Sequence, residues 1–152
     1  MPTFSSENYS FKEYCPQITI CIPSYNRGTR LLKNVKKWKR HLNKDYPILI
    51  LDNNSTQCKS DYEKIEDLAK VTDGLNYIRH QNNLLFEGNF LSMFRVVPSP
   101  FFLIVSDEDE PNFEGISQLN KRHPEMQDYG SLRASMAPIE GAIKRQSHIW
   151  DT

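Results

Sequence analysis

The strongest constraint on the fold is the alternation of short apolar runs with amphipathic stretches along most of the chain. Four segments are predicted to be strands: residues 18–22, 48–51, 75–79 and 101–105. Three segments between them have apolar residues at helical spacing and are predicted to be helices: residues 31–42, 61–71 and 88–97. Three of the strands are near-continuous apolar runs, which are typical of a parallel sheet covered on both faces by crossover helices. This order predicts an α/β domain with a Rossmann-like, mostly parallel sheet flanked by helices.

Prolines and the fading of the pattern set the expected boundaries. Pro23 is expected to end the first strand, because proline lacks the backbone N–H that a sheet uses. Residues 1–16 form a polar lead-in, and residues 17–152 are expected to form one domain, a usual length for a single domain. After residue 110 the pattern weakens, and the remaining predictions are a helix, a strand and a loose tail: residues 113–123, 129–136 and 141–152.

Charge and cysteine content argue against several classes of protein. Nineteen basic side chains balance nineteen acidic ones, whereas nucleic-acid-binding proteins usually carry a basic excess, so no nucleic acid partner is expected. The three cysteines form no C-x-x-C motif, which disfavours a disulfide framework or a zinc ribbon, and Cys21 is expected in the core. The N-terminus lacks the apolar stretch of a signal peptide, and no apolar run approaches the ~20 residues of a membrane span. A cytoplasmic location is the default expectation.

One basic patch stands out in the first predicted helix. Its members are Lys33, Lys36, Lys37, Lys39 and Arg40. Such a patch is either a solvated helix face or a surface that contacts anionic lipid or phosphate. Peripheral contact with the inner face of the membrane therefore stays open beside the cytoplasmic location.

Polar residues gather where three predicted strands end. The first strand is followed by residues 23–26, the second by residues 52–55 and the fourth by residues 107–110. Ligands of an open α/β sheet bind at the carboxyl ends of its strands. These groups, far apart in the sequence, are therefore expected to lie near each other.

The acidic residues 107–110 are the most informative of these groups. In an extended chain Asp107 and Asp109 point to the same side, and two such carboxylates repel unless a cation lies between them. Hard oxygen ligands with open positions suit Mg²⁺ or Mn²⁺, which would take its remaining ligands from water and a diphosphate. The alternative is a solvated acidic loop that caps the next helix.

The other two strand ends are ambiguous on their own. Asp52 can accept a hydrogen bond from an imide N–H, such as uracil presents, or from a ribose hydroxyl. On its own, however, the pattern is more typical of an Asx turn or a helix cap. Ser24, Tyr25 and Asn26 lie where a helix N-terminus would face a phosphate or a nucleoside, or where they simply cap that helix.

The remaining candidates carry less information. Arg27 and Arg30 can reach phosphates, although isolated arginines are more often surface charges. The histidines show no ligand spacing and are expected to be structural or exposed: His41, His80, His123 and His148. The sequence has no G-x-S-x-G, G-x-x-x-x-G-K-[ST] or G-x-G-x-x-G motif, which argues against an esterase, a P-loop protein and a dinucleotide-binding protein.

Four segments in order resemble a large inverting glycosyltransferase family with a GT-A fold, often called family 2. They are ITICIPSYNR at 18–27, ILILDNNS at 48–55, NLLFEGNF at 83–90 and FFLIVSDEDE at 101–110. Each motif alone is weak, and the four in this order are fairly specific. The resemblance implies a GT-A-like domain that is truncated on its C-terminal side, with the acceptor half largely missing.

The resemblance also implies a set of roles. The residues expected to bind a nucleotide sugar are Pro23, Ser24, Tyr25, Asn26, Arg27, Asp52, Asn54, Asn83, Asn89 and Asp107. Within this set Asp52 would bind the base, and Asn83 and Asn89 would shape the pocket. Asp107 and Asp109 would hold Mg²⁺ or Mn²⁺ on the diphosphate. The implied reaction transfers a sugar from a UDP- or dTDP-sugar to a hydroxyl of a glycan or glycolipid acceptor, with inversion, as in the synthesis of bacterial surface polysaccharides.

The chain departs from the family at several positions. Leu85 stands where glycine is usual, Gly88 where arginine is common, and Glu108 where a small residue or aspartate is commoner. The family's general base lies in a C-terminal half that is not matched here, so the catalytic base is unassigned and Glu140 is an isolated candidate. Two alternatives stay open: a non-catalytic or truncated nucleotide-sugar-binding module, and a phosphotransferase with a strand-end aspartyl nucleophile, of which a phosphoacceptor domain using Asp52 is a variant.

Overall fold

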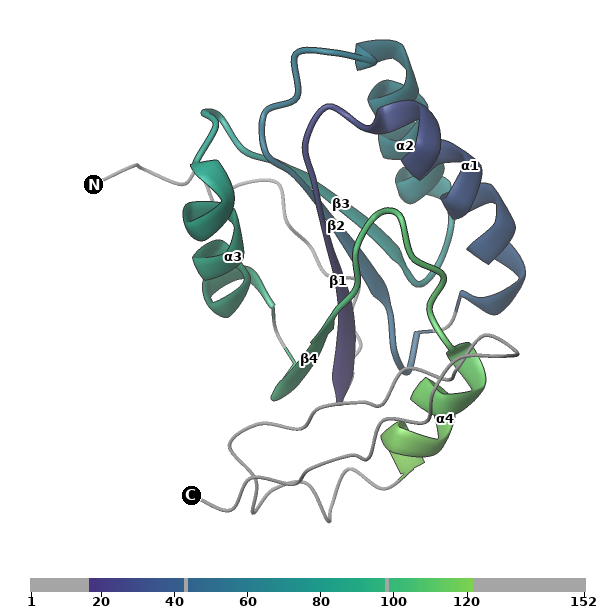
Figure 1. Ribbon diagram of the computed structural model, residues 1–152. Coiled ribbons are helices and arrows are strands. Elements are labelled where there is room, and N and C mark those ends of the chain that lie inside the picture. The colour runs from purple at the N-terminus through teal and green to yellow at the C-terminus, as the bar shows by residue number, and fades with distance from the viewer. Residues whose placement is uncertain (1–16, 43, 98, 122–152) are drawn as a thin grey trace, which may run out of the picture. The chain divides into compact units, whose positions relative to one another are not determined.

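The computed structural model describes residues 17–42, 44–97 and 99–121 (Figure 1). Strands alternate with helices in the order that the sequence predicts. The strands are β1 (Ile18–Ser24), β2 (Ile48–Asp52), β3 (Leu75–Arg79) and β4 (Phe101–Ile104). The helices are α1 (Gly28–Trp38), the short 3₁₀ helix η2 (Lys39–His41), α2 (Lys59–Val71), α3 (Leu85–Val96) and α4 (Phe113–Lys121).

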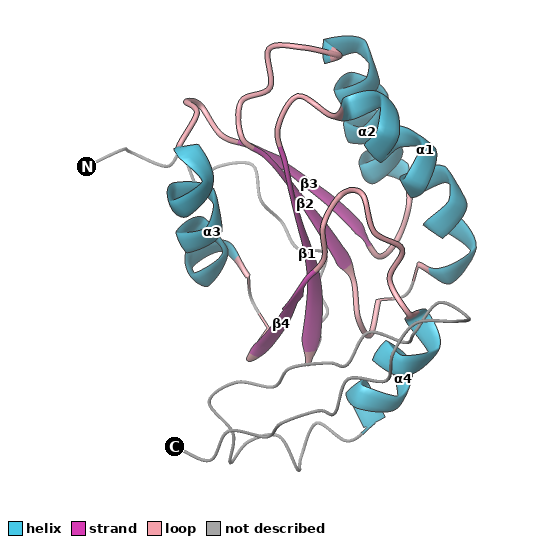
Figure 2. Cartoon of the chain, in the orientation of Figure 1, coloured by secondary structure: helices cyan, strands magenta, loops and turns pink. Residues whose placement is uncertain are grey.

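The strands form one parallel sheet in the order β3-β2-β1-β4. Helices α1 and α2 cover one face of the sheet, and α3 lies on the other (Figure 2). This arrangement confirms the predicted parallel α/β sheet, in which each crossover helix hides part of a face. The register places Ser24 opposite Asp52 and Asp52 opposite Arg79, so the ends of β1, β2 and β3 lie level with each other.

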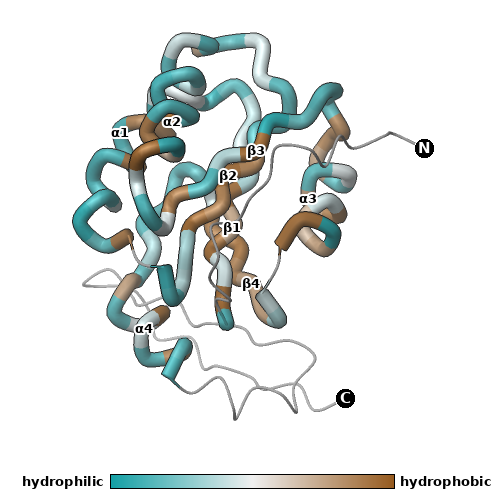
Figure 3. The backbone as a smooth tube through the Cα atoms, turned by 180° about the vertical axis from the view of Figure 1, so that it is seen from behind, coloured by the Kyte–Doolittle hydropathy of each residue, from teal (hydrophilic) through white to brown (hydrophobic). Residues whose placement is uncertain are grey.

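The core has two parts because successive strand residues point to opposite faces of the sheet. Leu31, Val35 and Trp38 of α1 pack with strand and α2 residues in the larger cluster, which confirms the apolar face predicted for the first helix. Cys21, a predicted core residue, belongs to the smaller cluster together with Met93 of α3. Figure 3 shows the hydrophobic residues concentrated along the central strands.

The sequence predicted that the first strand ends at Pro23, and this is wrong. Strand β1 runs through Pro23 to Ser24. The reason lies in the side to which each backbone group points. The Cys21 carbonyl faces β4, where it accepts a hydrogen bond from the Val105 N–H. The nitrogen of Pro23, two residues further on, faces the same side, and there β4 has already ended at Ile104. The missing N–H therefore falls beyond the end of the ladder.

The fourth strand is less buried than its apolar sequence suggests. β4 is an edge strand whose side chains are only partly buried, and Ile104 is exposed. The predicted full burial is wrong for β4, because a parallel sheet hides only its interior strands completely.

Helix α3 begins at Leu85 rather than at the predicted Gly88, and its Phe86 and Phe94 are exposed.

Helix α4 bears out the predicted last helix as far as Lys121. Several predictions concern residues that the structure does not describe: the end of that last helix, the polar lead-in, the further strand, the tail and Glu140. Within residues 17–121, apart from the two undescribed positions, no helix is long and apolar enough to cross a membrane.

Candidate functional site

Three strand ends meet at one edge of the sheet, on the face that α1 and α2 cover. Ser24 at the end of β1 lies opposite Asp52 at the end of β2. The Ser24 hydroxyl donates a hydrogen bond to Asp107 Oδ2 at 2.8 Å, which brings in the loop after β4. Ser24 and Asp52 point to the face of the larger core cluster because they follow Ile22 and Ile50 at the strand period of two.

Asp107 is an almost completely buried carboxylate of this edge. Its side chain is 1% exposed, and its Oδ2 also lies 2.9 Å from Arg27 Nε. Its other oxygen, Oδ1, is buried and has no hydrogen-bond partner among the described residues. Burial raises the pKa of Asp107, although the hydrogen bond from Ser24 and the charge of Arg27 act in the opposite direction. Asp107 is thus a desolvated carboxylate with one oxygen that the described protein groups leave unsatisfied.

The acidic loop is a turn and not the extended segment expected from the sequence. The Asp109 N–H donates to the Ser106 carbonyl at 3.1 Å, and the Glu108 N–H donates to the Ser106 hydroxyl at 3.2 Å. These bonds curl the chain directly after β4, so Asp107 is buried while Asp109 is exposed. The same-side argument for Asp107 and Asp109 is therefore wrong, and their assignment as metal ligands stays a prediction.

Asp52 is completely buried and both of its carboxylate oxygens are engaged. Oδ1 accepts the Ser55 N–H at 2.8 Å, which is the Asx-type contact that the sequence left as an alternative. Oδ2 accepts the Tyr77 hydroxyl at 2.8 Å and lies 3.4 Å from Arg79 Nη1. Burial, reinforced by the adjacent Asp52 charge, raises the pKa of Tyr77. Asp52 organises the end of β2, and its contact with a base stays a prediction.

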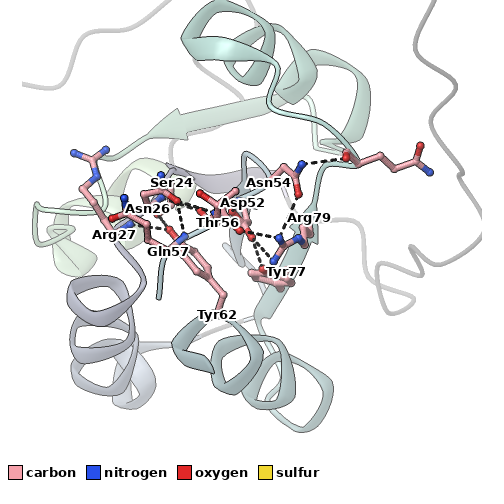
Figure 4. A network of polar contacts seen from close by, with 12 residues as sticks. Ser24, Asn26, Arg27, Asp52, Asn54, Thr56, Gln57, Tyr62, Tyr77 and Arg79 are labelled. Atoms are coloured by element: carbon pink, nitrogen blue, oxygen red, sulfur yellow. Dashed lines mark hydrogen bonds and ion pairs between the residues drawn. The ribbon is translucent and has the colours of Figure 1, made fainter. Parts of the chain in front are cut away.

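Asn26 ties the loop after β1 to the loop after β2 (Figure 4). Its Oδ1 accepts the N–H groups of Thr56 and Gln57 at 2.8 and 3.0 Å, and its own N–H donates to the Ser55 hydroxyl at 2.9 Å. Asn26 has φ 58°, a left-handed conformation that asparagine tolerates better than most residues. Beside it Tyr25 is 39% exposed.

Arg79 and Asn54 close the network on the side of β3. Arg79 Nη2 donates to the Ser55 carbonyl at 2.8 Å and to Asn54 Oδ1 at 3.2 Å. Asn54 Nδ2 donates to the Gln81 carbonyl at 3.1 Å. These contacts hold the second loop over Asp52. No sequence pattern distinguished Arg79, because an arginine at the end of a strand looks like any surface charge.

Asn83 and Asn89, which were predicted to shape the pocket, belong to two separate sets of hydrogen bonds. The set that includes Asn83 is built around Asn53. Asn53, next to Asp52 but pointing to the opposite face, donates to Asn83 Oδ1 at 2.9 Å and to the Leu85 carbonyl at 3.0 Å. Its Oδ1 accepts the Leu84 N–H at 2.8 Å. Asn53 therefore fastens the start of α3 to the end of β2, and its place directly after the predicted strand was the available signal for it.

Asn89 lies in a buried polar group beneath α3. Its Oδ1 is 3.0 Å from His80 Nε2, and the Ser92 hydroxyl is 3.1 Å from the same nitrogen. His80 is buried, as the structural interpretation of the histidines predicted. Burial lowers the pKa of His80, against the opposing effects of the Asn89 hydrogen bond and the Asp52 charge.

Leu85 occupies a left-handed backbone conformation with φ 59°. This conformation is unfavourable for a branched side chain and easy for glycine. In this chain the strained residue is held by the Asn83 side chain, which accepts the Leu85 N–H at 2.8 Å, and by Asn53.

Tyr62 of α2 joins the site although nothing in its sequence context marked it. Its hydroxyl is 2.7 Å from the Ser24 hydroxyl and accepts the Arg27 N–H at 3.1 Å. A tyrosine among charged helix residues at core spacing predicts only a packing role. Its functional contact depends on how α2 packs against the end of β1.

The carboxylates at this edge could supply only some of the ligands of a divalent cation. Across the described part of the chain, no group of three or more His, Cys, Asp or Glu side chains lies close enough to hold a metal ion by itself. The unsatisfied Oδ1 of Asp107 is nevertheless a hard, buried oxygen of the kind that Mg²⁺ and Mn²⁺ prefer. These residues fit a metal that takes most of its ligands from water and a bound phosphate.

Comparison with known proteins gives one family match. The family described as "Glycosyl transferase family 2" matches residues 19–130. No curated protein matches the sequence.

Several solved structures share the fold. Residues 1–349 of TarS from S. aureus align with a TM-score of 0.57 at 15% identity, over 72% of this chain and 32% of that one. The same fragment in complex with UDP-GlcNAc gives the same TM-score and identity, over 72% and 31%. The mannosyltransferase PcManGT from Pyrobaculum calidifontis, in complex with GDP-Man and Mn²⁺, aligns with a TM-score of 0.55 at 14% identity, over 77% and 34%. This chain spans about a third of the length of these structures.

Proposed function

The chain belongs to glycosyl transferase family 2 and has a GT-A-like fold, and on that premise we propose that it binds a UDP- or dTDP-sugar with a divalent metal. In the proposed reaction the sugar passes to an acceptor hydroxyl of a glycan or glycolipid, with inversion at the anomeric carbon. The observation that carries the proposal is the meeting of Ser24, Asp52 and Asp107 at the carboxyl edge of a parallel sheet, where such sheets bind their ligands.

Asp107 and Asp109 are the proposed holders of Mg²⁺ or Mn²⁺. Asp107 offers the unsatisfied buried oxygen Oδ1, and exposed Asp109 lies in the same turn. A divalent metal here would neutralise the diphosphate and stabilise the charge of the leaving nucleotide. The Mn²⁺ complex of PcManGT supports the choice of metal.

The loops around Asp52 are the proposed nucleoside site. Pro23 and the ring of Tyr25, an exposed residue, would pack against the base, and Asp52 would accept the imide N–H. Asp52 is buried beneath Arg79, which is partly exposed and 3.4 Å away, so base binding requires Arg79 to move. Arg79 would also give up its hydrogen bonds to the Ser55 carbonyl and Asn54 Oδ1, and the imide N–H would replace the guanidinium as a partner of Asp52 Oδ2.

The other predicted residues have supporting roles in the proposal. Arg27, with a half-exposed side chain beside Asp107, would contact the diphosphate, for which a planar guanidinium is suited. Ser24 orients Asp107. The asparagines would hold the loops in place through the contacts described above: Asn26, Asn54, Asn83 and Asn89. We assign no residue as the base that deprotonates the acceptor.

A second candidate is a non-catalytic module that binds the same nucleotide sugar. It requires the same donor residues and no base, and we assign no base among the described residues. An aspartyl phosphotransferase is not favoured, because Asp52 is fully buried with both oxygens engaged and a nucleophile must reach its substrate.

Calorimetric titration with a panel of nucleoside diphosphates, with and without Mn²⁺, tests the donor site. We expect Mn²⁺-dependent binding of a uridine or thymidine diphosphate, weakened roughly tenfold or more by Asp107→Asn and by Asp109→Asn. The matched control is Glu110→Gln, which removes an exposed acid of the same loop that faces Lys37 at 3.8 Å. Equal nucleotide binding by wild type and both aspartate variants would overturn the proposed metal site.

The proposal also includes a cytoplasmic location and peripheral contact with anionic lipid at the inner face of the membrane. The basic patch supports this contact, since Lys33, Lys36, Lys39 and Arg40 are all exposed on α1 and η2. Co-sedimentation with vesicles that contain phosphatidylglycerol tests it. Loss of binding in the variant Lys33→Gln/Lys36→Gln supports the contact, and no binding by the wild type rules it out.

A further inference from the structure

A directed chain of hydrogen bonds leads from helix α2 into the proposed donor site. It joins the Arg27 N–H to the Tyr62 hydroxyl at 3.1 Å, that hydroxyl to the Ser24 hydroxyl at 2.7 Å, and the Ser24 hydroxyl to Asp107 Oδ2 at 2.8 Å. The direction is set by the two ends. An amide N–H can only donate and a carboxylate can only accept, so Tyr62 donates to Ser24 and Ser24 donates to Asp107.

The chain is buried along its length, which makes each link matter. Tyr62, Ser24 and Asp107 are 1%, 2% and 0% exposed. A buried hydroxyl that loses its partner is destabilising, and successive hydrogen bonds in a low-dielectric interior polarise and strengthen each other. The Asp107 carboxylate is therefore held with Oδ2 engaged and with Oδ1 as the oxygen that no described group satisfies.

Gly28 at the start of α1 makes room for this arrangement. A Cβ atom at position 28 would lie 2.9 Å from both Cδ2 and Cε2 of Tyr62 and 3.0 Å from Cβ of Cys58. These distances are shorter than van der Waals contact, so any larger residue would push the ring away. The close approach of α1 to the tyrosine ring is what carries the hydroxyl to Ser24.

We propose that Tyr62 is a positioning residue of the donor site: through Ser24 it orients the Asp107 carboxylate so that Oδ1 is presented to the metal and diphosphate. The inference rests on the proposed function in taking Asp107 as a metal ligand. In this role Tyr62 would act on Asp107 through Ser24 and would touch neither the metal nor the donor. Its effect is on the orientation of a ligand, which in metal sites commonly changes affinity tenfold or more.

The test compares Tyr62→Phe with Tyr46→Phe. Both changes remove one hydroxyl from a tyrosine that packs against the same core cluster, and the Tyr46 hydroxyl makes no hydrogen bond with the described residues. We expect Tyr62→Phe to weaken Mn²⁺-dependent nucleotide binding roughly tenfold and to shift the ¹³C resonance of the Asp107 carboxyl in the metal-free protein. Tyr46→Phe should leave both unchanged.

Variants of Ser24 provide a second test. If Tyr62 acts through Ser24, the double variant Tyr62→Phe/Ser24→Ala binds nucleotide no more weakly than Ser24→Ala alone, because contacts in one chain are not additive. Ser24→Thr, which keeps a hydroxyl, should bind more tightly than Ser24→Ala. Tyr62→Phe behaving like Tyr46→Phe in both binding and the carboxyl resonance would overturn the inference.

The two proposals fail separately. If wild type and Asp107→Asn bind nucleotide equally, the proposed donor site is lost, and the carboxyl resonance still reports whether Tyr62 orients Asp107. If Asp107→Asn abolishes binding and Tyr62→Phe has no effect on either readout, the donor site stands and the role of Tyr62 is lost.

Discussion

Arg27 Nε lies 2.9 Å from Asp107 Oδ2, and the two side chains differ widely in exposure, at 46% and 1%. The arginine therefore neutralises a buried carboxylate from the solvent side. Its Nη1 also lies 3.2 Å from Glu108 Oε1, so one guanidinium pairs with two acids of the same loop. Because the Arg27 side chain is half exposed, we expect it to leave Asp107 when another cation binds there.

Arg27→Gln is expected to lower the free energy of unfolding of the metal-free protein by about 1 kcal/mol, a value reduced from that of fully buried pairs because Arg27 is half exposed. The same change should tighten the binding of Mn²⁺ alone, since no protein cation then competes for Asp107. Urea denaturation and calorimetry measure the two effects. Arg30→Gln, which removes an exposed partner of Glu108 at 3.5 Å, is the control and should change neither; equal behaviour of the two variants would contradict the competition.

Leu85→Gly is expected to raise the free energy of unfolding by roughly 0.5–1 kcal/mol. Relief of the left-handed conformation at φ 59° gains about 1–2 kcal/mol, and the greater freedom of glycine in the unfolded chain offsets part of it. Little burial is lost, because Leu85 is 68% exposed. Leu91→Gly, at an exposed position inside α3, should instead destabilise by about 1 kcal/mol. A loss of stability in both variants would show that Leu85 is not strained.

His80 should make stability depend on pH. Burial lowers its pKa below the ordinary value of 6.5, so the unfolded chain binds a proton more readily than the folded one. The free energy of unfolding is therefore intact above pH 6.5 and falls as pH drops from there through the folded-state pKa. Urea denaturation at about pH 7.5 and about pH 5.5 measures the loss. His80→Gln should reduce the difference between the two pH values, whereas His41→Gln, at an exposed residue, should not.

Cys21 and Cys58 should differ in reactivity. Cys21 is fully buried, and burial raises the pKa of its thiol to about 12, so almost no thiolate is present at neutral pH. Cys58 is exposed at the start of α2. Iodoacetamide treatment of the native protein, followed by peptide mass spectrometry, should label Cys58 and spare Cys21, and urea should make both reactive. Native labelling of Cys21 would mean that the core around β1 opens readily.

The sequence predicted the strands and most helices because their signals are local. Ile48 to Leu51 form an uninterrupted apolar run, and Leu31, Val35 and Trp38 recur at the helical period. The position of polar residues at strand ends is equally local, which is why Ser24 and Asp52 were identified as neighbours before any tertiary contact was known. Where a prediction failed, as at Pro23, the cause was a neighbouring strand whose end no local pattern reveals.

The partners of the polar groups were decided by tertiary packing alone. Tyr62 reaches Ser24 only because α2 lies against α1 at Gly28, and Asp107 is buried only because its loop curls into a turn beneath Arg27. A hydrogen bond joins particular atoms within about 3 Å, and the residues concerned are tens of positions apart in the chain. Side-chain periodicity determines which face of an element is buried, whereas contacts at that precision depend on how the elements pack against one another.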